Sequence, residues 1–135
     1  MKAPPLLVTR PPGLQLVLAV AVPAIYGLVC GVLLGVSAAL YTLLTLLALL
    51  GGVGAGYEHA DALEGAGRGV AGGMLFGTFI LLGHALAGTK AKTALPEPHV
   101  VLPIVTTILA AGGGALGGAL RGRHERRLNP PPTVA

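Results

Sequence analysis

The sequence predicts an all-α integral membrane protein whose four transmembrane helices pack through rows of glycine. Three observations predict this fold class. Asp, Glu, Lys and Arg make up only 10% of the 135 residues, hydrophobic residues make up 53%, and the mean hydropathy is +0.80. Several long stretches contain no ionisable side chain, as residence in lipid requires. Many of the 22 glycines recur at intervals of four residues within or beside those stretches.

Residues 1–12 and 123–135 are the expected tails of a transmembrane domain that covers residues 13–122. The first tail carries Lys2 and Arg10 among four prolines. Proline resists helix formation, so we expect an extended cytoplasmic segment at the headgroup surface. The second tail is basic and then proline-rich, and we expect it to be disordered.

The stretch from Pro11 to Tyr57 contains no Asp, Glu, Lys, Arg or His. It is more than twice the ~20 residues that one crossing needs, so it predicts two helices, at 13–35 and 38–57. Pro23 should bend the first helix, because proline removes one backbone N–H. An alternative with three crossings would lay the leucine-rich part of this stretch in the interface, but that part lacks the polar face of a surface helix.

The second half of the chain predicts two more crossings. Residues 58–68 hold three of the five carboxylates and form a polar loop. A third helix is expected at 65–88, where His84 is the one ionisable group within the apolar run from 69 to 89. The fourth helix is expected at 99–120, with a proline in its first turn, where proline is tolerated.

Four crossings place both termini on one side, and the basic residues indicate which side. The inner set is Lys2, Arg10, Arg68, Arg121, Arg123, Arg126 and Arg127, and the outer set is Lys90 and Lys92. Cytoplasmic loops carry the excess of Lys and Arg, so the pattern predicts an N-in, C-in topology in the cell (inner or plasma) membrane.

Glycines spaced by four form small-residue faces on three of the helices. They are Gly27, Gly31 and Gly35; Gly65, Gly69, Gly73 and Gly77; and Gly114, Gly118 and Gly122. Four residues are slightly more than one helical turn, so each row makes a shallow groove in which another backbone can approach closely. The rows either hold one protomer together or face outward and form an oligomer or a larger complex.

Glu58, His59, Asp61 and Glu64 form the densest polar patch and are a candidate ion or proton site on the inner face. Helical spacing points His59 about 100° away from Glu58, which is poor geometry for one metal ion. The alternative is structural: Glu64 and Arg68 have the i, i+4 order that stabilises a helix.

His84 and His99 are a candidate pair at the outer face. His84 lies about 28 Å along a helix that begins near Gly65, and His99 begins the next helix at the same boundary. The alternative is that both are interfacial histidines that reach water.

No Asp, Glu, Lys or Arg falls near the middle of any expected span, which argues against proton-coupled antiport. No nucleophile has a base at a local spacing, and the glycine repeats lack the lysine of a phosphate-binding loop, so we expect no enzyme, no cofactor and no metal. Nucleic-acid motifs are also absent from the sequence.

These observations favour an oligomeric or accessory subunit of a membrane complex. The expected partners are the bilayer, further copies or a larger complex, and anionic lipid at the basic tails. A small oligomeric channel or transporter for an ion or neutral solute is the alternative, and a membrane enzyme that uses His84 and His99 as ligands ranks last.

Overall fold

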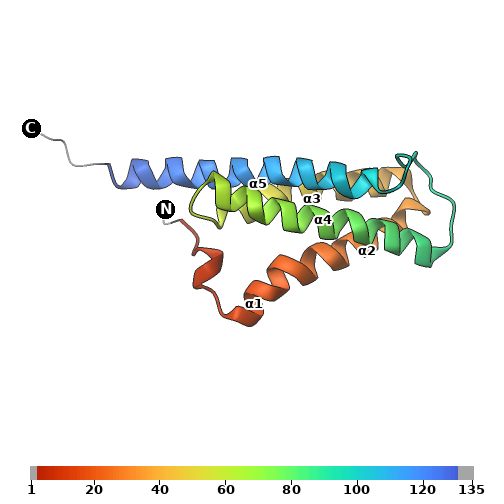
Figure 1. Ribbon diagram of the computed structural model, residues 1–135, viewed down its shortest axis with the longest axis horizontal. Helices are drawn as coiled ribbons and strands as arrows, with labels where there is room; N and C mark the ends of the chain where they lie inside the picture. Colours follow the sequence, from red (N-terminus) through yellow and green to blue (C-terminus); the bar gives the residue numbers. More distant parts are fainter. Residues whose placement is uncertain (1–2, 131–135) are drawn as a thin grey trace, which may run out of the picture.

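The computed structural model describes residues 3–130, which are all helical or irregular (Figure 1). In that range, four helices are long and apolar enough to cross a membrane. The predicted all-α, multi-pass architecture is confirmed to that extent. The first described residues and the end of α5 lie toward one end of the bundle, here called the terminal end, and residues 88–100 lie at the other, the loop end (Figure 1). Lys2 and residues 131–135 lie outside the described range.

The first crossing consists of three segments: α1 (Pro12–Leu16), a π-helical segment η2 (Val17–Ala21) and α2 (Val22–Leu34). The backbone N–H of Val22 donates to the carbonyl of Val17, five residues back, rather than four. The π-helical segment ends two residues before Pro23, close to the bend that the sequence predicted. Figure 1 shows α1 diverging from the other helices, while α2 runs back toward them.

Polar caps define where α3 (Ala38–Tyr57) and α4 (Ala62–Ala87) begin. The Ser37 hydroxyl accepts the N–H of Leu40 at 3.3 Å. The Asp61 carboxylate accepts the N–H groups of Leu63 and Glu64, both at 2.9 Å. These bonds satisfy donors that a helix start leaves unpaired.

The last helix, α5 (Val101–Leu128), is longer than the sequence predicted. We expected the helix to end near residue 120, with a disordered tail beyond it, but residues 121–128 continue the helix. Arg121 and Glu125 form an i, i+4 ion pair at 2.7 Å, and two arginines in the last turn complement the helix dipole. At roughly 1.5 Å per residue, α5 is about 42 Å long and exceeds a hydrocarbon core of about 30 Å.

Helix α4 packs against α5 and α2 at backbone distance along its glycines. A Cβ built on Gly73 would lie 2.5 Å from the carbonyl oxygen of Thr106, and one built on Gly27 would lie 2.5 Å from that of Phe76. Such separations are shorter than real Cβ contacts, so only glycine fits there. Nine of the ten predicted glycines meet neighbours this closely, whereas the nearest atom to a Cβ on Gly122 is 3.8 Å away.

The hydrophobic core occupies only part of the bundle. Cys30, Phe76, Ile80 and Leu102 form its buried cluster. Beside it, the Tyr26 hydroxyl donates to the carbonyl of Leu44 at 3.0 Å and joins α2 to α3. Nearer the terminal end, a cavity lies between α2 and α3.

Candidate functional site: a cleft between α2 and α3

A cavity of about 620 Å³ lies between α2 and α3, and residues of α4 and α5 form its floor. Its walls are mostly apolar and include Val22, Tyr26, Ala48 and Gly73, with Arg68 among the polar exceptions. The volume falls within the roughly 300–1,000 Å³ of typical small-molecule sites. The cleft is therefore large enough to hold a small molecule.

The cleft extends over about half of a bilayer. Its lining runs along α3 from Thr45 to Ala55 and along α4 from Arg68 to Phe76. At roughly 1.5 Å per residue these segments measure about 15 and 12 Å, against about 30 Å of hydrocarbon. The core cluster fills the remainder of the bundle, toward the loop end.

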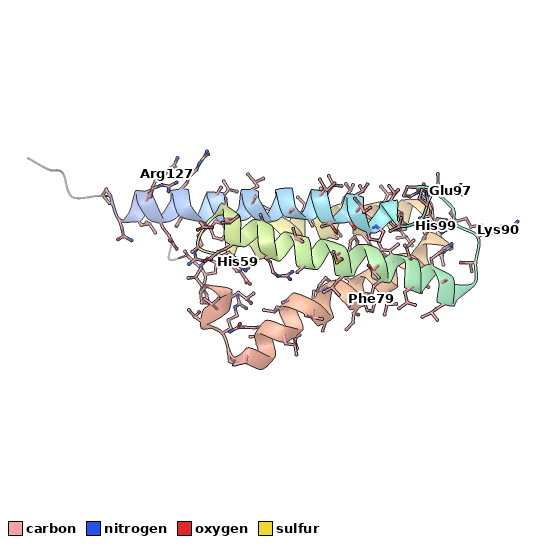
Figure 2. All side chains as sticks on the ribbon, in the orientation of Figure 1. His59, Phe79, Lys90, Glu97, His99 and Arg127 are labelled. Carbon is pink, nitrogen blue, oxygen red and sulfur yellow. The ribbon has the colours of Figure 1, made fainter. Side chains whose placement is uncertain are left out.

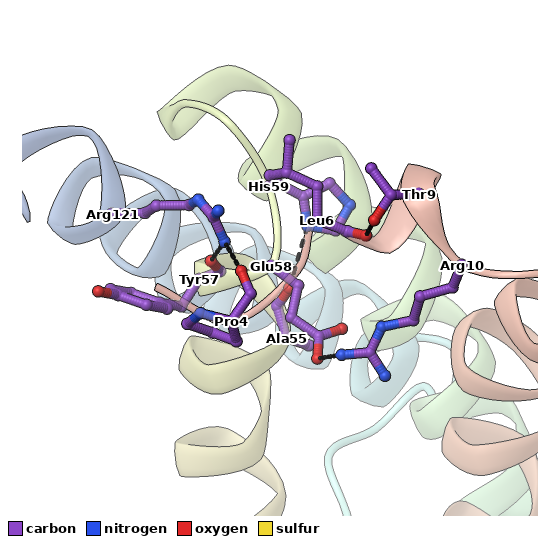
Figure 3. Close-up of polar contacts among 9 residues, drawn as sticks. All are labelled: Pro4, Leu6, Thr9, Arg10, Ala55, Tyr57, Glu58, His59 and Arg121. Carbon is purple, nitrogen blue, oxygen red and sulfur yellow. Dashed lines mark hydrogen bonds and ion pairs between the residues drawn. The ribbon is translucent and has the colours of Figure 1, made fainter. Parts of the chain in front are cut away.

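The N-terminal segment closes the cleft at the terminal end. The N–H of Leu7 donates to the carbonyl of Glu58 at 2.9 Å, and the Arg10 guanidinium pairs with the Glu58 carboxylate (Figure 3). Leu7 is buried and lines the cavity. The sequence predicted a surface tail for residues 1–12, whereas residues 3–10 fold against the bundle.

Arg121 fastens this segment to two helices. Its side chain is buried, and its Nη1 donates to the carbonyls of Pro4 at 2.7 Å and Tyr57 at 3.2 Å (Figure 3). Its Nε donates to Glu125. Guanidinium groups satisfy several acceptors at once, so one side chain joins the N-terminal segment, the end of α3 and α5.

Arg68 reaches into the cleft and bonds to α2 rather than to its expected partner. Its Nη2 donates to the carbonyl of Leu18 at 2.6 Å. In the π-helical register, the carbonyl of Leu18 would accept from the backbone N–H of residue 23. Residue 23 is proline and has no backbone N–H. Glu64, which we expected to pair with Arg68, instead accepts the N–H of Ala60 at 3.1 Å. Arg68 therefore satisfies the carbonyl that Pro23 leaves free.

The side chains of Glu58, His59, Asp61 and Glu64 do not converge on one site, because each makes its own hydrogen bond or ion pair. Glu58 pairs with Arg10, Asp61 caps α4 and Glu64 bonds to the backbone. His59 Nδ1 lies 3.0 Å from the carbonyl of Ala55. Between residues 3 and 130, no three His, Cys, Asp or Glu side chains gather closely enough to hold a metal ion.

His84 and His99 both lie toward the loop end, and Figure 2 places His99 near Glu97 and Lys90 there, opposite His59 and Arg127. His84 belongs to α4, where its backbone N would lie 2.7 Å from a Cβ built on Gly31. Its Nδ1 is buried without a hydrogen-bond partner among the described residues. His99 is exposed. No hydrogen bond within the described chain joins these two residues.

Sequence reasoning did not identify Arg10 and Arg68 as members of one site. One signal was available in the sequence: Arg10 and Arg68 each lie directly before a long apolar stretch. A charge so close to the hydrocarbon needs a partner. Comparison with protein-family models, curated proteins and solved structures finds no match.

Proposed function

We propose that the protein is a non-enzymatic multi-pass membrane subunit that works as a homo-oligomer or as an accessory part of a larger membrane complex. The observation that carries this proposal is the exposure of α3. All of α3 is described, and Gly56 is its one buried residue. A helix that its own protomer covers so little has a surface available for a neighbour.

One face of α3 has the spacing of a helix-pairing seam. Leu40, Leu43, Leu47, Leu50 and Gly54 follow one another at intervals of three and four residues and are all exposed. This spacing brings one stripe of a helix against a partner helix. Among the alternatives, the spacing favours a second copy that pairs through its own α3, as a two-fold interface requires.

The glycine rows suit contacts within one protomer, whereas the leucines of α3 suit contacts between protomers. Lipid provides no hydrophobic force between helices, so close van der Waals contact is the main source of their association. We propose that the rows on α2, α4 and α5 hold one protomer together as a glycine zipper, because eight of their ten glycines, all but Gly35 and Gly122, closely approach backbone atoms of the same chain. Association between protomers then falls to the leucines of α3.

Replacing Leu43 and Leu50 together with alanine should separate the protomers. The two leucines are 53% and 67% exposed, and their truncation removes contact area from the seam without opening the protomer core. Light scattering of the purified, detergent-solubilised protein should give a multiple of 13.4 kDa for the wild type and 13.4 kDa for this variant.

The matched control replaces Ile104 and Ile108 of α5 with alanine. These residues are 52% and 64% exposed, like the two leucines, but they belong to α5 and are not part of the α3 seam. This variant should keep the wild-type mass. A wild-type mass of 13.4 kDa, or equal masses for the two double variants, would contradict the homo-oligomer.

We also propose the N-in, C-in topology in the cell membrane, supported by the arginines at the terminal end and the lysines at the loop end. In a Cys30→Ser background, an impermeant thiol reagent added to intact cells should label Lys90→Cys and leave Arg127→Cys unlabelled until the cells are opened. The reverse pattern would contradict the topology, and labelling of both in intact cells would contradict the even number of crossings.

The channel or transporter alternative has the cleft as its one supporting feature. The cleft lining is mostly apolar, and the carboxylates of the expected ion or proton site are bonded to Arg10 or to the backbone. Ion paths require accessible polar groups along their length. An apolar cleft and bonded carboxylates therefore favour the subunit over the channel.

A further inference from the structure

The cleft between α2 and α3 opens sideways into the region that acyl chains would occupy. Two of its lining residues, Val22 on α2 and Leu46 on α3, are 48% and 56% exposed. Both belong to segments that are apolar enough to lie in hydrocarbon. An apolar space of this kind is unfavourable for water, which needs two or more polar partners.

The length of the cleft identifies the shape of its occupant. A helix from another protein would cross the whole bilayer, but the cleft ends where Tyr26 meets Leu44 and the packed core begins. A lipid acyl chain occupies one leaflet, and the cleft runs about 12–15 Å, close to half of the hydrocarbon. One acyl chain of the leaflet on the terminal side fits this geometry.

The charges at the terminal end identify the headgroup. At this end Glu58 and Arg68 line the cleft and Arg10 pairs with Glu58, so the three side chains together carry a net charge of +1. Among the described residues, the bond to Leu18 is the one hydrogen bond that the Arg68 guanidinium makes, out of five N–H donors. Its remaining donors are available to an anion, and arginine suits phosphate oxygens in particular.

We propose that the cleft binds one anionic phospholipid of the bilayer, with an acyl chain between α2 and α3 and its phosphate beside Arg10 and Arg68. This site is distinct from lipid attraction to the basic tail of α5. Its walls belong to one protomer, and of the α3 seam residues only Leu47 lines it.

Filling the cleft tests the acyl-chain site. A Cβ on Gly52 or on Gly54 would meet no atom within 4 Å, so leucine at either position is compatible with the fold. Gly52 lines the cleft, whereas Gly54 lies on the outer face of α3. Native mass spectrometry of the full chain in detergent with added phosphatidylglycerol should detect one tightly held lipid in wild type and Gly54→Leu, and severalfold less in Gly52→Leu.

Charge variants test the headgroup site. The wild type should hold phosphatidylglycerol about fivefold more tightly than phosphatidylcholine of the same acyl chains, the preference expected for one uncompensated charge near the surface. Arg10→Gln should lose this preference. Arg126→Gln, which removes an exposed arginine from the end of α5, should keep it.

Four outcomes would overturn the proposal. Equal lipid retention in Gly52→Leu and the wild type would place the lipid outside the cleft. Loss of lipid in Gly54→Leu alone would place it on the outer face of α3. Loss of the headgroup preference in Arg126→Gln rather than Arg10→Gln would assign the attraction to the basic tail. A lower particle mass in Gly52→Leu with unchanged lipid would mean that a second copy fills the cleft.

Discussion

Leucine in place of Gly69 should part α4 from α5 and prevent the bundle from forming. A Cβ at this position would lie 2.5 Å from the carbonyl carbon of Ala110 and 2.7 Å from the Cα of Ala111. Both neighbours are backbone atoms, which cannot rotate away as a side chain can. Overpacking in a core typically costs about 1–3 kcal/mol when side chains can adjust, and we expect a larger loss here.

Thermal unfolding in detergent, followed by circular dichroism and by protease resistance, measures this loss. The control is Gly67→Leu, two residues earlier in the same helix, where a Cβ would meet no atom within 4 Å. Gly67→Leu should unfold near the wild-type temperature, and Gly69→Leu should be degraded without a cooperative transition. Similar behaviour of the two variants would show that backbone contact does not hold α4 to α5.

Replacing Arg68 with methionine should destabilise the first crossing, and Pro23→Ala should relieve much of that loss. Without Arg68, the Leu18 carbonyl has no partner in hydrocarbon, and a buried unsatisfied group costs about 1–3 kcal/mol. Alanine at position 23 supplies the N–H that proline lacks, so the carbonyl can bond within its own helix. The two substitutions should therefore be coupled.

A double-mutant cycle measures the coupling from the unfolding free energies of the wild type, both single variants and the double variant. The expected coupling is about 1 kcal/mol, within the range for residues that share a partner. The control cycle pairs Pro23→Ala with Arg126→Met, which removes an arginine at the far end of α5, and should be additive. Additivity in the Arg68 cycle would refute the assigned role of this arginine.

The features that depend on local sequence were predictable. Uncharged length predicted four helices, and the structure places α3 at the expected 38–57. Pro23 predicted a bend, and the chain responds with a π-helical segment just before it. These predictions rest on hydrophobic length and on one missing N–H, which are properties of neighbouring residues.

The candidate site was not predictable, because contacts between distant residues create it. Arg10 and Glu58 are 48 positions apart, and Arg121 and Pro4 are 117 positions apart. The partner of Arg68 depends on which carbonyl the helix register leaves free, and hydropathy does not report that. Spacing also predicted glycine faces without indicating whether they point into the protomer or outward.

The most direct test of the account measures the distance between the backbones of α4 and α5 in a bilayer. A Cβ on Gly65 would lie 2.9 Å from the carbonyl carbon of Gly114, and the reverse separation is also 2.9 Å. Solid-state NMR of glycine-labelled protein in phospholipid vesicles should therefore detect a cross peak between the carbonyl carbon of one and the Cα of the other. Absence of this cross peak, in spectra that resolve contacts within each helix, would contradict a bundle joined through its glycine backbones.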